Sequence, residues 1–150
     1  MGILCLSETP DDIIMWSHYA DGHKGLVLQF DKDRLESYGY CKKVEYYKDY
    51  PTLRDLNESK LSNEGMTKLF LLRKANHWSY EAEWRMIINI INGQRIVKFP
   101  KEILIGVIFG CQMHKKDKEK VREWIDSSNM QVKIYEAVKD EESYSLKISL

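Results

Sequence analysis

The stretch Lys74-Ala-Asn-His-Trp-Ser-Tyr-Glu-Ala-Glu-Trp-Arg85 joins a segment with helical periodicity to the most apolar strand-like segment of the chain. From Glu81 onward its polar and apolar residues alternate, which is typical of an extended strand with two different faces. The alternation predicts that Glu81, Glu83 and Arg85 lie on one face of a strand. Two carboxylates and a guanidinium beside aromatic residues fit either the edge of an active site or a salt-bridged sheet edge.

The composition is that of an ordinary globular protein. With 150 residues, of which 43% are hydrophobic, the chain is long enough for one domain with a core, and we expect a single domain over residues 1–150. The 23 basic and 23 acidic residues give a formal net charge of zero. Zero net charge disfavours a general affinity for nucleic acid or anionic membranes, although a local groove for nucleic acid stays open.

Cysteine usage and hydropathy indicate the compartment. Cys5, Cys41 and Cys111 are far apart in the sequence and form no C-x-x-C pair. This spacing favours reduced thiols over a disulfide framework or a structural zinc site. No apolar run approaches the roughly 20 residues of a membrane span. We therefore expect a soluble cytoplasmic protein with no membrane partner, and a homodimer is left open.

Periodicity and turn signals predict twelve elements in the order β-α-β-α-β-α-β-β-β-α-β-β. The strands are expected over residues 3–6, 26–30, 40–47, 84–91, 95–99, 104–109, 131–138 and 144–150. The helices are expected over residues 10–20, shortly after Asp31, over 62–76 and over 115–128. Hairpin strands mixed with helices favour an α+β fold with a mixed or mostly antiparallel sheet and three to four helices.

Local signals add details to this outline. Thr9 is expected to cap the first helix and Asp31 the second. The Asn92-Gly93 pair predicts a hairpin turn. The last helix is expected to direct Trp124 inward together with its aliphatic neighbours.

The first candidate site lies at the end of the first predicted helix, where His18 and His23 flank the Asp21-Gly22 turn. Neutral histidine can bind a metal or transfer protons near neutral pH. The structural alternative is that His18 satisfies the end of the helix and His23 fixes the turn. Spacing leaves both interpretations open, because it does not identify the partners of either histidine.

The second candidate site consists of Glu81 and Glu83 with Lys74 and Arg85. A Glu-x-Glu pair at the end of a strand can hold ribose hydroxyls, activate a nucleophile or bind a hard cation. Charged residues that alternate along an exposed strand are also explained by cross-strand ion pairs. The sequence leaves both explanations open.

Trp78 and Tyr80 lie between these charged residues in the sequence. Their rings are suited to stacking on a base or a sugar, and equally to packing in the core or at its rim. The sequence has no phosphate-binding Walker loop, no Rossmann fingerprint and no G-x-S-x-G motif, so no motif names a substrate.

Several motifs together resemble a known family. In chain order they are Cys5-Leu-Ser-Glu8, Met15-Trp-Ser-His-Tyr-Ala-Asp-Gly-His-Lys-Gly25 with a following strand to Phe30-Asp31, Trp78-Ser-Tyr-Glu-Ala-Glu-Trp-Arg85, Phe99-Pro100 and Ile108-Phe-Gly110. They resemble the bacterial domain of unknown function family 2971 over nearly the whole chain. The resemblance implies a bacterial cytosolic protein, and some members are thought to accompany phage-defence or mobile-element genes.

Members of this family usually begin with a further segment that contains a Tyr/Arg-rich strand and an Asn-Asp-Pro turn. The chain lacks this segment. We therefore expect a short member or a fragment, and the missing segment is expected to hold half of any site.

The leading hypothesis is an enzyme-like domain that binds a nucleotide or an NAD-like ligand and catalyses ADP-ribosyl or related glycosyl transfer. It rests on a fold-level analogy with the catalytic carboxylates of ADP-ribosyltransferases. In this analogy Glu83 grips the nicotinamide ribose, Glu81 orients the acceptor and Ser7 faces the ligand. His18 or His23 contacts phosphate. The Arg or His that those enzymes place on their first strand has no counterpart here.

Two alternatives use the same residues. A metal-dependent nuclease or phosphoesterase would need His18, His23, Glu81 and Glu83 around one ion. A non-catalytic binding or dimerisation module would contain them as a buried polar network. All three hypotheses expect the histidine turn to lie beside the start of the central apolar strand. The candidate catalytic residues are thus Glu83, Glu81 and His18, and the candidate ligand-binding residues are Ser7, His23, Lys74, Trp78, Tyr80 and Arg85.

Overall fold

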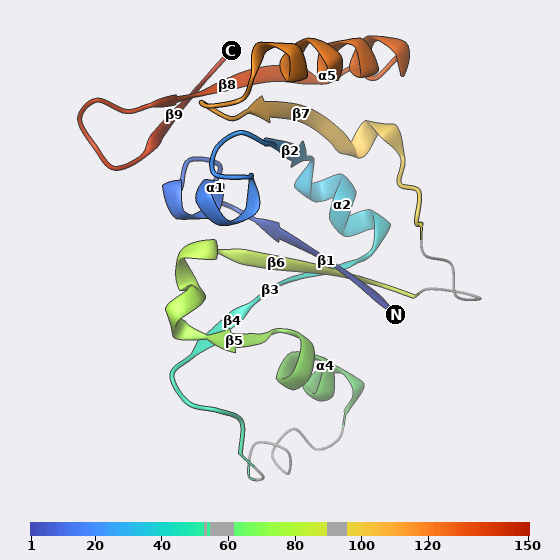
Figure 1. The fold of residues 1–150 in the computed structure, drawn as a ribbon. Helices are drawn as coiled ribbons and strands as arrows, with labels where there is room; N and C mark the ends of the chain where they lie inside the picture. The colour runs from blue at the N-terminus through green and yellow to red at the C-terminus, as the bar shows by residue number, and fades with distance from the viewer. Residues whose placement is uncertain (53, 55–61, 90–95) are drawn as a thin grey trace. The chain divides into compact units, whose positions relative to one another are not determined.

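The computed structural model describes all residues except 53, 55–61 and 90–95. Helices and strands occur together, which confirms the predicted α+β class (Figure 1). The described residues contain four α-helices, namely α1 (Ile13–Tyr19), α2 (Lys32–Tyr38), α4 (Asn63–Leu71) and α5 (Lys115–Ser127). The chain separates into two compact units. Unit 1 comprises Met1–Thr9 and Gly39–Gly93, and unit 2 comprises Pro10–Tyr38 and Gln94–Leu150. The expected single domain stays a prediction.

Unit 1 contains a three-stranded antiparallel sheet with the order β1-β6-β3. Its strands are β1 (Gly2–Ser7), β3 (Tyr40–Lys43) and β6 (Glu83–Ile88). The register sets Ser7 opposite Glu83 and Cys5 opposite Arg85. Because side chains alternate along a strand, these four residues share one face of the sheet.

A second pair of strands in unit 1 replaces parts of two predicted elements. The strands β4 (Glu45–Tyr47) and β5 (Arg73–Ala75) pair in parallel. The predicted strand 40–47 breaks at Val44, whose N–H donates to the carbonyl of Glu83, whereas the N–H of Glu45 donates to the carbonyl of Leu72. The predicted helix 62–76 ends at Leu71, because pairing with β4 draws the following residues into a sheet.

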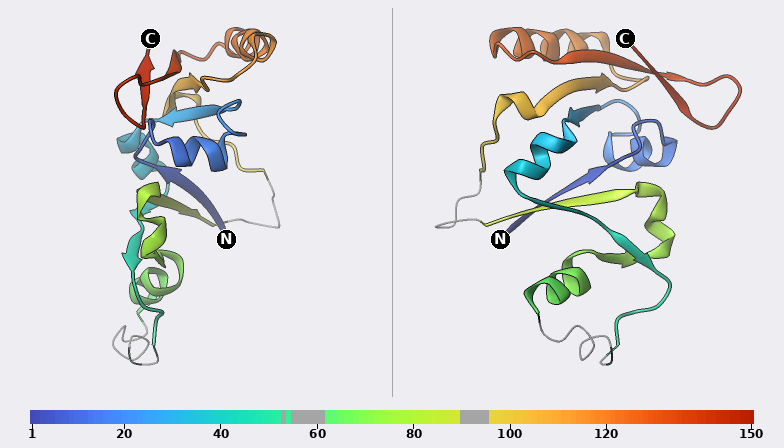
Figure 2. Two further views of the ribbon diagram at one scale, coloured as in Figure 1. Left: turned by 60° about the vertical axis from the view of Figure 1, so that its left-hand side comes forward. Right: turned by 180° about the vertical axis from the view of Figure 1, so that it is seen from behind.

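Unit 2 contains a mixed four-stranded sheet with the order β2-β7-β8-β9. Its strands are β2 (Leu26–Phe30), β7 (Leu104–Phe109), β8 (Lys133–Lys139) and β9 (Leu146–Ser149). The strands β7 and β8 are parallel, and α5 forms the crossover between them, as Figure 2 shows from two further sides. The strands β8 and β9 form the predicted antiparallel hairpin.

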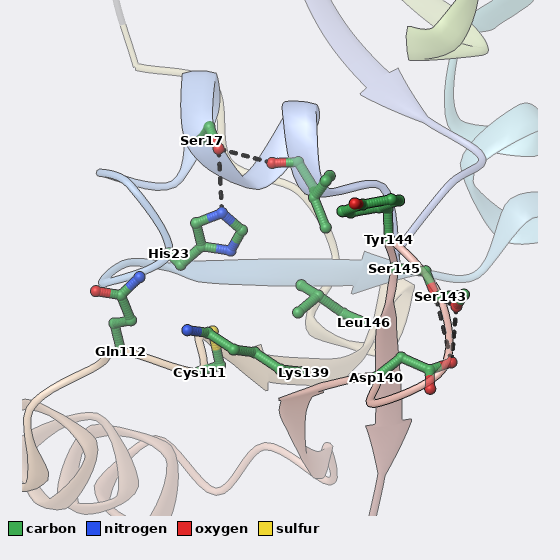
Figure 3. Close-up of a pocket in the computed structure, with 11 residues that line it drawn as sticks. Ser17, His23, Cys111, Gln112, Lys139, Asp140, Ser143, Tyr144, Ser145 and Leu146 are labelled. Atoms are coloured by element: carbon green, nitrogen blue, oxygen red, sulfur yellow. Dashed lines mark hydrogen bonds between the residues drawn. The ribbon is translucent and has the colours of Figure 1, made fainter.

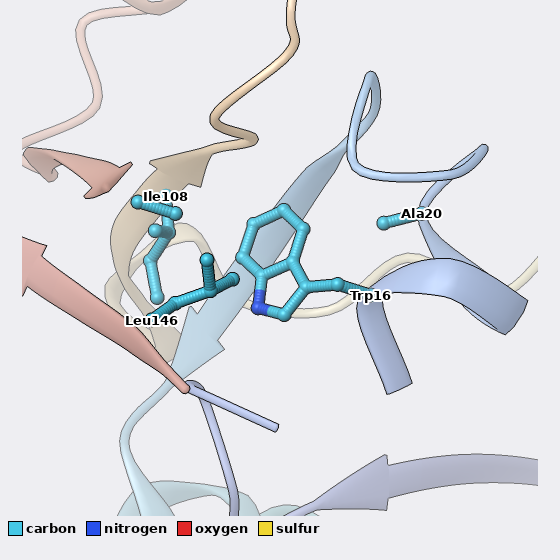
Figure 4. Packing of buried hydrophobic residues seen from close by; sticks show 5 residues of the cluster. Trp16, Ala20, Ile108 and Leu146 are labelled. Atoms are coloured by element: carbon cyan, nitrogen blue, oxygen red, sulfur yellow. The ribbon is translucent and has the colours of Figure 1, made fainter. Parts of the chain in front are cut away.

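The core of unit 2 lies on both faces of β7. Val107 and Phe109 point to one face, where they pack against Val121 and Ile125 of α5. Ile108 points to the other face and packs in a second cluster with Trp16 of α1, Ala20 directly after this helix, Ala137 of β8 and Leu146 of β9 (Figure 4). A strand buried on both faces explains why residues 104–109 form a continuous apolar run.

Some of the local predictions are confirmed and others are wrong. The Asp31 carboxylate accepts the N–H of Arg34, as predicted for the cap of α2. Trp124 is 58% exposed instead of inward, because the α5 surface that packs on β7 is formed by Val121 and Ile125. Residues 96–99 are not in a strand, and the predicted Asn92-Gly93 hairpin lies outside the described residues.

Helix α1 begins three residues later than predicted and has a different cap. The carboxylate of Asp12 accepts the N–H groups of Ile14 at 2.8 Å and Met15 at 2.9 Å. The hydroxyl of Thr9, the predicted cap, instead contacts the hydroxyl of Ser7 at 3.0 Å. Asp12 therefore satisfies two of the N–H groups that a helix start leaves without a helical partner.

We expect Asp12→Ala to lower the free energy of unfolding by about 1 kcal/mol, the usual cost of losing an N-cap carboxylate. Urea unfolding followed by circular dichroism measures the effect. Asp11→Ala is the matched control, because it removes the same charge one residue earlier without removing a cap. Equal losses in the two variants, or a loss only in Thr9→Ala, would contradict the assignment.

Candidate functional site

The candidate site of unit 1 is formed where the chain turns from β5 into β6. The 3-10 helix η1 (Asn76–Glu81) connects these strands and ends at Ala82, which adopts a left-handed conformation with φ of 42°. Glu81 therefore lies at the end of η1 and not on a strand. The predicted alternation from Glu81 is wrong at this point because the left-handed residue interrupts it, whereas Glu83 and Arg85 do share one face of β6.

The turn nevertheless gathers the four predicted charged residues into one ion-pair network. The Lys74 ammonium donates to Glu81 and, at 2.9 Å, to Oε2 of Glu83. The Arg85 guanidinium donates to Glu83 through Nε at 2.7 Å and through Nη2 at 3.2 Å. Two carboxylates thus face one ammonium and one guanidinium, so their formal charges cancel.

The two carboxylates of this network are buried. Glu81 and Glu83 are each 3% exposed. Burial alone would raise the pKa of Glu83, but hydrogen bonds from Arg85, Lys74 and Cys5 outweigh it and lower the pKa to about 2. Burial opposes the charge of Lys74, yet its bonds to the two carboxylates raise its pKa. Glu83 and Lys74 are therefore both charged at neutral pH.

The network also joins several elements of unit 1. Arg85 Nη1 donates to the carbonyl of Leu71 at the end of α4, at 2.6 Å. The N–H of Glu83 donates to the Tyr46 hydroxyl of β4 at 2.8 Å. Ser7, at the end of β1, donates from its hydroxyl to the carbonyl of Glu81 at 2.7 Å. The Ser7 hydroxyl therefore fixes the end of η1.

Two residues of the site were not predicted from the sequence. Tyr46 contacts Glu83 across a distance of 37 residues in the chain, which no local pattern reveals. Cys5 lies opposite Arg85 in the sheet and beside Glu83, and burial followed by the Glu83 carboxylate raises the pKa of its thiol. The sequence did contain a signal for Cys5. It lies two residues before Ser7, which ends a predicted strand, and side chains two residues apart on a strand share a face.

The aromatic residues lie at the outer edge of the network. Trp78 is 39% exposed, and its ring centre is 5.2 Å from the Lys74 ammonium and 6.0 Å from the ring centre of Tyr80. The Trp78 ring therefore lies over the ammonium, and part of the Trp78 side chain stays accessible to solvent.

The two predicted histidines belong to unit 2. His18 is exposed in the last turn of α1 and meets the Tyr19 ring edge-on at 6.2 Å. His23 lies in the turn after α1, where its Nε2 is 3.0 Å from the Ser17 hydroxyl and its ring stacks on Trp16. The histidines lie in unit 2, whereas Glu81 and Glu83 lie in unit 1. A pocket that these four residues share therefore stays a prediction. Within the described ranges, no cluster of three or more His, Cys, Asp or Glu residues is arranged to hold a metal ion.

Comparison with known proteins gives a match to one family model over part of the chain. The family model described as protein of unknown function (DUF2971) matches residues 15–86, which confirms the family predicted from the motifs. No curated protein and no solved structure matches the chain. In the described part of the chain, no helix has the length and apolar character that a membrane span requires.

The ion-pair network predicts a specific dependence of stability on pH. The pKa of Glu83 lies near 2 in the folded protein against an ordinary value of 4.5. A lowered pKa means that Glu83 stabilises the fold above about pH 4.5 and that this contribution, on the order of 3 kcal/mol, is lost as the pH falls toward 2. Glu83→Gln should therefore flatten the loss of stability in this interval.

Urea unfolding between about pH 7 and pH 3 measures this dependence. Glu123→Gln is the control, because Glu123 is an exposed carboxylate of α5. If Glu83→Gln and the wild type differ by a constant amount across the interval, Glu83 does not have the lowered pKa.

Proposed function

We propose that this chain, whose residues 15–86 match the family of unknown function DUF2971, acts as a non-catalytic binding module in which Lys74, Glu81, Glu83 and Arg85 are a structural network. The observation that carries the proposal is that both carboxylates are 3% exposed and each is paired with a cation of the same unit. A substrate could reach them only after an ion pair opens, and breaking a buried ion pair is costly.

The ionisation of Glu83 supports the same conclusion. A general acid or base works best when its pKa lies near the pH at which the enzyme operates. The pKa of Glu83 is about 2, so this carboxylate neither gives nor takes a proton readily at neutral pH. Lys74 is also engaged, because both carboxylates neutralise its ammonium.

The contact surface of the module in this proposal is the exposed part of η1. The network fixes both ends of this helix, since Lys74 precedes it and Glu81 ends it. Trp78 is held between them with 39% of its surface exposed. A rigid aromatic residue contributes much contact area at a low entropic cost, which suits a binding surface.

A second candidate is the enzyme-like domain that binds NAD and transfers ADP-ribosyl groups, with the association to phage defence that the family resemblance suggests. The observation that favours it is the convergence of Ser7, Glu81 and Glu83 at one end of the unit 1 sheet. In this case the ion pairs would open when the ligand binds, and Glu83 would hold the nicotinamide ribose.

The free energies of unfolding of two variants distinguish the binding module from the transferase. If the network is structural, Glu81→Gln and Glu83→Gln should each lower the free energy of unfolding by roughly 1–3 kcal/mol at neutral pH, because buried partners are left unpaired. Active-site carboxylates often show the opposite, since neutralising them removes strain. Urea unfolding of both variants, with Glu123→Gln as the control, measures the difference, and a gain in stability would contradict the structural role.

Isothermal titration calorimetry with NAD provides an independent test. The binding-module proposal expects no NAD binding that depends on Glu83. The transferase candidate expects saturable heat that disappears in Glu83→Gln while Glu123→Gln still binds. Saturable binding of NAD that is lost only in the Glu83 variant would overturn the non-catalytic proposal.

A further inference from the structure

Unit 2 contains a pocket that the ion-pair network does not involve. Its volume is about 320 Å³, and it lies between α1, the turn that follows β7 and the hairpin of β8 and β9 (Figure 3). This volume falls in the range of small-molecule sites. The lining residues that matter for its chemistry are Ser17, His23, Cys111, Gln112 and Lys139.

The position of His23 is fixed by the backbone around it. His23 adopts a left-handed conformation with φ of 69°, which is uncommon for residues other than glycine. Its N–H donates to the carbonyl of Trp16 at 3.3 Å, and its carbonyl accepts the N–H of Gln112 at 3.0 Å. A Cβ atom on Gly110 would lie 2.1 Å from that carbonyl, so only glycine lets the end of β7 approach the turn.

The hydrogen bonds of Ser17 define the tautomer of His23. The Ser17 hydroxyl donates its one proton to the carbonyl of Ile13 at 2.7 Å. The contact of 3.0 Å between the Ser17 oxygen and Nε2 of His23 therefore requires that Nε2 carries a proton and donates it. Nδ1 of the neutral ring is then a bare acceptor. This arrangement does not activate Ser17 as a nucleophile, because His23 cannot accept its proton.

The acceptor Nδ1 of His23 is buried and has no hydrogen-bond partner among the described residues. A buried polar atom without a partner is costly and rare in folded proteins, unless a bound molecule supplies the missing hydrogen bond. The free acceptor is therefore suited to an N–H or O–H donor on a ligand.

Lys139 supplies positive charge to the same pocket. It is exposed at the end of β8, and its side chain extends toward the side of the pocket that holds His23 (Figure 3). Asp140 also lines the pocket, but its carboxylate is already neutralised by Lys147 at 3.0 Å and bound by the Ser143 hydroxyl at 2.9 Å. Within the described ranges, no ion pair of Lys139 competes with a ligand.

We propose that this pocket binds a small anion that also carries a hydrogen-bond donor, of the class of short hydroxycarboxylates. The donor group bonds to Nδ1 of His23, and the carboxylate pairs with the ammonium of Lys139. This site is separate from the network of unit 1 and goes beyond the proposed function, so it stands whether or not that proposal holds.

Three matched probes test the two parts of this recognition. Lactate carries both a hydroxyl and a carboxylate, propionate lacks the hydroxyl, and propane-1,2-diol lacks the carboxylate. Titrations followed by NMR should give saturable binding of lactate in the millimolar range, which is typical of so small a ligand. Propionate should bind roughly 5–100-fold more weakly, because it leaves the buried acceptor unpaired. Propane-1,2-diol should also bind more weakly than lactate. Equal affinity of lactate and propionate would overturn the proposal.

The ring nitrogens of His23 give a readout that is independent of affinity. In the free protein, ¹H–¹⁵N correlation spectra should show a proton on Nε2 and none on Nδ1, with the signals assigned by their loss in His23→Gln. Lactate should shift the Nδ1 signal and propionate should not. A proton on Nδ1 in the free protein, or no Nδ1 shift on adding lactate, would overturn the proposal.

A pair of lysine variants tests the charge. Lys139→Gln should weaken lactate binding at least fivefold and leave the His23 tautomer unchanged, because it removes only the cation. Lys133→Gln is the matched control, since Lys133 is exposed on the same strand and does not line the pocket. If the two variants bind lactate equally well, Lys139 does not recognise the anion.

Discussion

The sharing of one Lys74 ammonium between Glu81 and Glu83 is the interaction on which unit 1 depends. A charge can be buried only when an opposite charge and hydrogen bonds replace the water that it loses. Arg85 completes the compensation and extends it to the end of α4. Neighbouring bonds attach β1 and β4 to the same residues, so the network fixes how η1 is held against the sheet.

The polar groups of unit 2 follow a different principle. The network of unit 1 pairs each of its charges, whereas the turn after α1 holds His23 in a left-handed conformation with one ring nitrogen unpartnered among the described residues. Gly110 allows this turn to approach the end of β7, and Trp16 stacks on the imidazole from the apolar core. A paired, buried set of charges stabilises a fold, whereas a fixed but incomplete polar group is suited to a ligand.

The sequence predicted the elements whose pattern arises from local rules. The strands over residues 26–30 and 104–109 have the predicted bounds, and α5 ends within one residue of its prediction. The errors occur where tertiary contacts override a local preference. Residues 73–75 continue the helical pattern of α4, but pairing with β4 makes them a strand. Likewise Asp12, and not Thr9, caps α1.

By itself the sequence determined the α+β class, the resemblance to the family whose model matches residues 15–86, and the set of charged residues around Glu83, because these depend on residue types and short spacings. Only the tertiary structure decided that the carboxylates are buried and paired, and that His23 lines a pocket with a buried ring nitrogen that has no hydrogen-bond partner among the described residues. The physical reason is that burial, pKa and hydrogen bonding depend on neighbours such as Tyr46 and Gly110, which are distant in the chain and leave no mark in local periodicity.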